Sequence, residues 1–362
     1  MGQGPGRGPA DLLKPSALLA RLARPWRDPV IILPYLGYGT RRRLVVCGRV
    51  LEDEGFRPAA DADTRWRNLV RFYKRLESDE VAGARVRGRF FGLEKETVTD
   101  GEGYFRIELK IDALQPGIWQ EVELELLHPA PARAVARVLV PSPRARFGVI
   151  SDIDDTVVSS NVTRKLRLLL TVALTNARTR KPFPGVAAFY RALHAGANPV
   201  FYVSRSPWNL YAPLVEYLEV QGFPAGPLLL RDFGLSSSRN HKTEVIAAIL
   251  ASYPKLGFIL IGDSGEQDPE IYAAIVRRFP RRIRAIYIRS VNPGRVGEIE
   301  KLAAAIAKTG CQLVLAPEAG PAAAHAAAEG LIQASELRAV RAEERSDASS
   351  ASNAAASSDA LK

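Results

Sequence analysis

The sequence predicts two folded domains of different classes: a smaller β-rich, sandwich-like domain, followed by an α/β domain with a Rossmann-like parallel sheet. The chain has 362 residues and 47% hydrophobic content, enough for two cores at ~100 to 200 residues per domain. Strand-forming segments fill the first part of the chain. After PSPRAR, residues 141–146, short apolar segments alternate with helical patterns, which is typical of a parallel sheet covered by helices.

The strands of the first domain are expected where apolar residues alternate with polar or charged ones, between turn signals. These segments are LVVCGRVL, ARVRGRFFGL, YFRIELKI, WQEVELELL and ARAVARVLV. We expect a basic N-terminal segment at residues 1–28, the β-rich domain at 29–145, the α/β domain at 146–316 and a tail at 317–362. SDASSASNAAASSDALK can bury no core, so the tail is predicted to be disordered after a short helix near Leu331.

The strands of the second domain are expected in six short apolar segments: FGVIS, NPVFYVS, GPLLLRD, GFILIGD, IRAIYIR and QLVLA. Each of the first four ends in a polar residue. Open α/β sheets bind ligands at the carboxyl ends of their strands, so these polar ends predict the position of a functional site.

Composition limits the classes of protein and partner. Cys47 and Cys311 lie far apart in apolar runs, which excludes a disulfide framework. No segment resembles a signal peptide, and no run reaches the ~18 apolar residues of a spanning helix. We therefore expect a cytoplasmic protein whose membrane contact, if it has one, is peripheral. The net charge of +11 suits anionic lipids, phosphate-bearing polymers and small anions alike, and nucleic acid is not an expected partner.

FGVISDIDDTVVSS, residues 147–160, places three carboxylates within four positions at the end of a predicted strand. Asp152, Asp154 and Asp155 repel one another, and folding alone gives no reason to assemble them. Such an arrangement usually serves a cation or a reaction. Asp155 is explained equally well as a cap of the following turn.

Further polar residues follow the later strands in an order that suits phosphoryl transfer. Asp152, Asp154 and Thr156 lie at the end of the first strand or just after it. The later motifs contain Ser204 and Arg205 in SRSPW, Lys242 at the start of KTEVIAAIL, and Asp263 and Asp268 in GDSGEQD. A phosphate ester repels nucleophiles, so its hydrolysis needs a cation on the nonbridging oxygens, an aligned nucleophile and a proton for the leaving group.

We assign the nucleophile to Asp152 and the general acid and base to Asp154. Mg²⁺ would be held by Asp152, the main-chain carbonyl of Asp154 and Asp263, with Asp268 as a weaker candidate. Ser204 and Lys242 would contact the phosphate, together with Thr156 and Arg205. The alternatives are helix capping for Ser204, a solvated side chain for Lys242 and a first-turn helix residue for Asp268.

The order DxDxT, Ser, Lys and GDxxxxD resembles the four motifs of the haloacid dehalogenase superfamily of phosphohydrolases. SDIDDTV, NARTRKPFPGVAAFYRAL, SRSPWNLY and GPLLLRDFG are similar to the catalytic domain of the actin-patch type of phosphatidate phosphatase, which is related to the lipin type. The resemblance covers roughly residues 147–300. It implies a parallel sheet of the haloacid dehalogenase type and Mg²⁺-dependent removal of phosphate from phosphatidate, giving diacylglycerol.

NVTRKLRLLLTVALTNARTRKPFPG, residues 161–185, lies between the first two motifs and predicts an amphipathic helix with a basic stripe. The superfamily usually carries a lid at this point, so the segment could meet an anionic membrane or cover the site. The basic residues concerned are Arg164, Lys165, Arg167 and Arg178. A core-packing helix with a solvated basic face is the alternative.

Other functions are compatible with the same residues. A phosphatase of a soluble phosphoester, such as a sugar phosphate, a nucleotide or a polynucleotide end, would use the same chemistry. A phosphorylated receiver domain lacks both the second acid of DxD and the late GDxxxxD. A P-loop enzyme is excluded because GxxxxGK[ST] is absent. A non-catalytic lipid- or protein-binding module is the remaining alternative.

Overall fold

The computed structural model describes residues 29–52, 80–115, 117–153, 183–231 and 241–359, of which 209 and 350–359 are described by backbone only. The described residues form two compact units. The first comprises residues up to 138, except 117 and 118, and the second comprises those two and residues from 139 onward. The domain limits expected from the sequence remain a prediction.

The first unit is built on an antiparallel sheet, as the alternating segments predicted. Its strands are β1 (Val30–Pro34), β2 (Gly37–Thr40), β3 (Arg43–Glu52), β4 (Arg85–Phe90), β5 (Leu93–Val98), β6 (Tyr104–Lys110), β7 (Trp119–His128) and β8 (Ala132–Leu139). Neighbours follow the order β1-β3-β2-β8-β7-β4-β5, and β6 pairs with β3. In β7 the buried Val122, Leu124 and Leu126 alternate with Glu121, Glu123 and Glu125, because successive side chains of a strand point to opposite faces. All these strands are connected in one sheet. The sandwich-like arrangement expected from the sequence remains a prediction.

The second unit is a parallel sheet with helices, which confirms the α/β prediction for this part of the chain. The strands are β9 (Gly148–Asp152), β10 (Val200–Pro207), β11 (Leu228–Arg231), β12 (Phe258–Asp263), β13 (Ile283–Arg289) and β14 (Gln312–Ala316). The sheet order is β11-β10-β9-β12-β13-β14. The six strands coincide with the six apolar segments named from the sequence. Every residue of β9 and β12 is buried, as expected for central strands covered on both faces.

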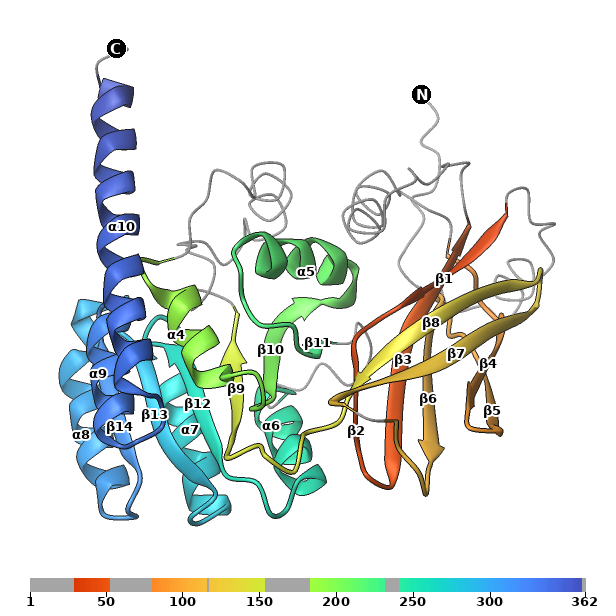
Figure 1. The fold of residues 1–362 in the computed structure, drawn as a ribbon, viewed down its shortest axis with the longest axis horizontal. Helices are drawn as coiled ribbons and strands as arrows, with labels where there is room; N and C mark the ends of the chain where they lie inside the picture. The colour runs from red at the N-terminus through yellow and green to blue at the C-terminus, as the bar shows by residue number, and fades with distance from the viewer. Residues whose placement is uncertain (1–28, 53–79, 116, 154–182, 232–240, 360–362) are drawn as a thin grey trace, which may run out of the picture. The chain divides into compact units, whose positions relative to one another are not determined.

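Helices follow the strands, as Figure 1 shows. They are α4 (Val186–His194), α5 (Tyr211–Val220), α6 (His241–Ser252), α7 (Asp268–Arg278), α8 (Val296–Ala307), α9 (Ala319–Ala328) and α10 (Ala334–Asp359), with short 3₁₀ turns η3 (Trp208–Leu210) and η4 (Pro293–Arg295). The sheet order reverses between β9 and β12, because β10 lies on the other side of β9. This reversal creates the position at which α/β sheets bind ligands. No helix in the described ranges is long and apolar enough to cross a membrane.

The prediction of a disordered tail was wrong for Ala319–Ala328 and Ala334–Asp359, which form α9 and α10. Leu331, Ile332 and Val340 are buried, and α10 packs against α9 and α4. Carboxylates of α10 also bind the helices that it contacts: Asp347 accepts the N–H of Gly185 at 3.1 Å, and Glu343 pairs with Arg191. Composition suggested a solvated tail because it does not reveal that these charges have partners elsewhere in the fold.

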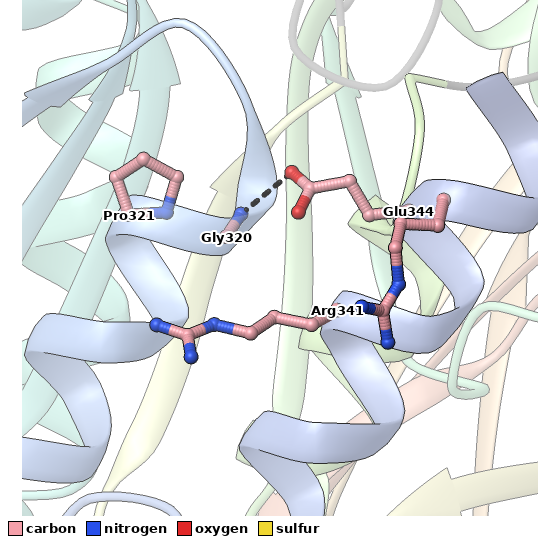
Figure 2. A pocket seen from close by; sticks show the side chains of 5 residues that line it. Gly320, Pro321, Arg341 and Glu344 are labelled. Carbon is pink, nitrogen blue, oxygen red and sulfur yellow. Dashed lines mark hydrogen bonds between the residues drawn. The ribbon is translucent and has the colours of Figure 1, made fainter.

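An open hollow of about 350 Å³ lies between α9 and α10. Figure 2 shows Glu344 reaching across it to the main chain of Gly320, whose N–H donates to Glu344 Oε1 at 2.9 Å. The hollow is lined by Gly320, Pro321, Arg341, Glu344 and Arg345. None of these residues belongs to the motifs that predicted phosphoryl transfer.

Candidate active site

The described motif residues lie together at the carboxyl edge of the parallel sheet. Asp152 is the last residue of β9, Asp263 is the last residue of β12, and Ser204 lies in the second half of β10. The strand registers bring them together, since Ser151 is opposite Ile261 and Asp152 is opposite Val203. The clustering expected from the strand ends is therefore found.

Three carboxylates form the centre of the site. Asp152, Asp263 and Asp268 each offer an oxygen within 4.8 Å of the others, and their exposed fractions are 1%, 0% and 0%. Burying three carboxylates this close is unfavourable without positive charge nearby, because desolvation and mutual repulsion add. The cluster therefore needs cations.

Lys242, in the first turn of α6, supplies one of them. Its side chain is 1% exposed, and its ammonium lies 2.7 Å from Asp152 Oδ1 and pairs with Asp268 Oδ1. Desolvation lowers the pKa of Lys242, but the charges of Asp152, Asp268 and Glu266 outweigh it and raise that pKa above its ordinary value. The lysine is thus a permanent cation at neutral pH, and the solvated reading of Lys242 is wrong.

Asp268 holds the site together through both of its oxygens. Oδ1 pairs with Lys242, and Oδ2 accepts the main-chain N–H of Asp263 at 3.2 Å. Burial raises the pKa of Asp268, and the charge of Lys242 opposes that rise. Gly262 is required here, because a Cβ on it would lie 2.3 Å from Asp268 Oδ2. The geometry makes Asp268 a positioning residue for Asp263 and Lys242.

The loop after β12 wraps around the Asp263 carboxylate. Asp263 Oδ1 accepts the N–H groups of Gly265 at 2.5 Å and Glu266 at 3.1 Å. Arg295 donates to the carbonyl oxygens of Ser264 at 3.0 Å and Glu266 at 2.5 Å. The Ser264 hydroxyl accepts the N–H groups of Val291 and Asn292. The loops after β12 and β13 are therefore tied together at the sheet edge.

Ser204 and Arg205 come from β10. Ser204 is fully buried, and its hydroxyl oxygen accepts the N–H of Ser206 at 2.9 Å. Arg205 is partly exposed and lies 3.5 Å from Glu266 Oε2. The same oxygen lies 3.5 Å from Lys242 Nζ. Glu266 thus stands between the two cations that the sequence assigned to phosphate.

Hydrogen bonds behind the sheet edge hold the main chain of Asp152. The Ser151 hydroxyl donates to the carbonyl oxygen of Asp152 at 2.6 Å and lies 2.5 Å from the hydroxyl of Tyr190. Burial raises the pKa of Tyr190, so this phenol stays neutral. The contacts restrict the direction in which the Asp152 side chain leaves β9.

Several predicted site residues lie outside the described ranges. They are Asp154 and Thr156 of the first motif and the basic residues of the inserted segment, Arg164, Lys165, Arg167 and Arg178. Sequence reasoning also missed Glu266, Arg295 and Tyr190. Glu266 lies inside the GDSGEQD motif, so its spacing was a usable signal, whereas no sequence pattern distinguished Arg295 or Tyr190.

The cluster suits a divalent cation. Asp152, Asp263 and Asp268 carry three negative charges, and Lys242 neutralises one of them. The second nearby cation, Arg205, is balanced by Glu266. Hard divalent cations prefer oxygen ligands, and these three carboxylates offer buried oxygens within 4.8 Å of one another.

Comparisons with known proteins agree with the motifs. Residues 147–290 match the family described as "Phosphatidate phosphatase APP1, catalytic domain", which confirms the resemblance for that segment. The Saccharomyces cerevisiae protein named phosphatidate phosphatase APP1 is 39% identical over 151 residues, which is 40% of this chain and 26% of the yeast protein.

A Schizosaccharomyces pombe protein, named uncharacterized protein C29B5.04c, is 30% identical over 165 residues, covering 44% of this chain and 27% of its own length. The chain thus spans about a quarter of each of these two relatives. Among solved structures, the alignment with a carbohydrate acetylesterase from Xanthomonas citri covers 70% of this chain and 68% of the esterase chain. The sequence identity is 12% and the TM-score is 0.26. That likeness is too low to identify a fold.

Proposed function

We propose, from the match of residues 147–290 to the phosphatidate phosphatase catalytic-domain family, that this chain is a Mg²⁺-dependent phosphatase that converts phosphatidate to diacylglycerol. The observation that carries the proposal is the buried contact of Lys242 with Asp152, at 2.7 Å, beside Asp263 and Asp268. It supplies a carboxylate nucleophile, a fixed cation and metal-suited oxygens within one matched segment.

In the proposed reaction an oxygen of Asp152 bonds to phosphorus while the ester P–O bond breaks, and the departing alkoxide takes a proton from Asp154. Water then attacks the aspartyl-phosphate and gives a proton to Asp154. This releases inorganic phosphate and restores the Asp152 carboxylate. Mg²⁺ held by Asp152, Asp263 and the carbonyl of Asp154 would supply positive charge to the phosphate oxygens.

The fixed positions in the site explain how these steps are aligned. Lys242 places its positive charge 2.7 Å from Asp152 Oδ1 and fixes the position of this carboxylate. Asp268 orients Lys242 and the main chain of Asp263. Ser204, Arg205 and Thr156 are the proposed donors to the phosphate. From the same motifs, we propose that the parallel sheet of the α/β unit is of the haloacid dehalogenase type.

The protein is proposed to act in the cytoplasm and to meet its lipid peripherally. The inserted segment, through Arg164, Lys165, Arg167 and Arg178, is one proposed contact with anionic membrane, because each basic residue near such a surface adds to the attraction.

The test is phosphate release by the purified protein from phosphatidate in mixed micelles, beside sugar phosphates, nucleotides and phosphorylated oligonucleotides. We expect phosphatidate to be the best substrate, with activity lost in EDTA and restored by Mg²⁺. Faster turnover of a soluble ester would overturn the lipid assignment. Absence of turnover on every substrate with Mg²⁺ would favour the non-catalytic alternative.

Asp154→Asn is expected to slow hydrolysis of phosphatidate by about a hundredfold or more, while an activated aryl phosphate loses far less. An activated leaving group needs little protonation, so losing the general acid matters mainly for a poor one. The measurement is the ratio of kcat/KM for the two substrates in the variant and the parent. An unchanged ratio would show that Asp154 does not protonate the leaving group.

Glu266→Gln is expected to tighten binding of inorganic phosphate by about threefold, because removing a negative charge 3.5 Å from Arg205 and Lys242 leaves both cations to the phosphate. Neither distance is short enough for a strong hydrogen bond, so phosphate can displace this carboxylate. The inhibition constant for phosphate measures the change. Glu298→Gln is the control, since Glu298 is exposed and pairs with Arg295 instead. Unchanged inhibition in Glu266→Gln would contradict the expectation.

A further inference from the structure

The turn between β4 and β5 exposes large apolar side chains. Phe91 is 62% exposed and Leu93 is 38% exposed. Among the described residues, the large hydrophobic side chains with high exposure are Phe91, Leu93, Val98, Val135 and Val220, so three of the five belong to this hairpin. Val98 lies at the far end of β5, but Phe91 and Leu93 lie together at the turn, and neighbouring exposed apolar side chains call for an explanation where scattered ones do not.

The backbone of the turn makes the choice of Phe91 unusual. Phe90 pairs with Leu93 across the hairpin, so Phe91 and Gly92 form a two-residue turn. Their φ angles are 46° and 78°, the sign that a type I′ turn requires at both positions. Asn-Gly is the preferred pair there, because a bulky side chain is strained at positive φ. Folding therefore does not favour phenylalanine at this position.

The exposed ring of Phe91 packs against the buried ring of Phe90. The rings of Phe90 and Phe91 meet edge to face, with their centroids 4.8 Å apart and their planes at 79°. Phe90 is 3% exposed and belongs to the core of the β unit. An aromatic side chain that is already ordered loses little freedom on insertion into another phase, which favours binding.

The charges of the hairpin are mostly paired with one another. Arg85, Arg87 and Arg89 form ion pairs with Glu94, Glu96 and, on the neighbouring strand β7, Glu125. Lys95 is exposed on β5, which lies at the end of the sheet (Figure 1). It forms no ion pair with any residue in the described part of the chain. An apolar tip beside this lysine complements an anionic lipid surface, where the ring enters the interface and the ammonium of Lys95 meets headgroups.

We propose that the β4–β5 turn is a membrane anchor, in which Phe91 and Leu93 enter the interfacial layer of an anionic bilayer. The proposal rests on the proposed function, because phosphatidate is itself an anionic lipid of such a bilayer. It is independent of the inserted segment, since the anchor belongs to the β unit. It gives that unit a role: holding the phosphatase at the surface where its substrate lies.

The test uses Phe91→Asn in the full chain, since asparagine is the residue that the turn prefers. We expect the thermal midpoint to stay the same or rise, while sedimentation with vesicles of phosphatidate and phosphatidylcholine falls by about fivefold. Binding is measured in EDTA, so that it does not depend on turnover. Val98→Thr is the matched control, because Val98 is 58% exposed at the far end of the same strand, and its vesicle binding should stay unchanged.

Activity assays distinguish the proposed membrane anchor from the proposed phosphatase function. Phe91→Asn should lose activity on phosphatidate in vesicles and keep it on a soluble phosphate ester. Phe91→Trp should keep vesicle binding, and brominated lipid should quench its added fluorescence. Unchanged vesicle binding in Phe91→Asn, or an equal loss in Val98→Thr, would overturn the anchor. So would a change in oligomeric state without a change in vesicle binding. A parent protein that binds vesicles but does not hydrolyse phosphatidate would overturn the function alone.

Discussion

Replacing Asp152 with asparagine is expected to abolish phosphate release, by about a thousandfold or more, while leaving the fold intact. The amide cannot attack phosphorus and is a poor ligand for Mg²⁺, yet it has almost the shape of the carboxylate. Lys242 retains its contact with Asp268 in the variant, so a buried cation is not left alone. Phosphate release and circular dichroism, measured on the same preparation, check both halves of the expectation.

Asp112→Asn is the control for this change, because Asp112 is exposed on the β unit and should tolerate the amide without loss of activity. Turnover of more than a few per cent in Asp152→Asn would exclude Asp152 as the nucleophile. Loss of the circular dichroism signal would instead mean that the carboxylate is needed for folding.

Lys242→Met is expected to have the second-largest effect, because it damages stability and catalysis together. It leaves Asp152 and Asp268 buried without their cation, and removing one partner of a buried ion pair costs about 3 to 5 kcal/mol of unfolding free energy. Chemical denaturation at pH 7 in EDTA measures this loss. Mg²⁺ should restore part of the stability by supplying positive charge to the same carboxylates, whereas phosphate release should stay at least about a hundredfold below the parent.

Lys255→Met provides the matched control, since Lys255 is exposed just after α6 and its loss should leave stability and turnover nearly unchanged. A Lys242→Met protein as stable as the parent in EDTA would show that the buried carboxylates do not depend on this lysine. The role assigned to Lys242 in balancing the charge of Asp152 would then be wrong.

Local sequence was enough to locate the strands of the α/β unit and the first members of the site. Apolar segments of strand length mark β9 to β14, and parallel strands bring their carboxyl ends to one edge of a sheet. Asp152, Ser204 and Asp263 follow directly from that rule, since each lies at or near the end of such a segment. The family resemblance depended on the same residues, and residues 147–290 confirm it.

The contacts between those elements could not be read in the same way. Whether Lys242 reaches Asp152 and Asp268 or points to solvent depends on how α6 packs on β10, and no local pattern encodes that packing. Arg295 is similar: it binds the carbonyl oxygens of a loop about thirty residues earlier in the chain. Both residues look like ordinary surface cations in the sequence.

The same limit explains the C-terminal region and the turn at Phe91. Ala- and Ser-rich sequence with many charges is compatible with a solvated chain or with α10, and the difference lies in the partners that Glu343, Glu344 and Asp347 find on α4 and α9. RFFGL reads as part of a strand until the pairing of β4 with β5 places Phe91 in the turn. Strand periodicity and strand-end chemistry are local properties of the chain. Charge pairing, exposure and turn position follow from contacts between segments distant in sequence, whose energies depend on distances and burial that exist only after folding.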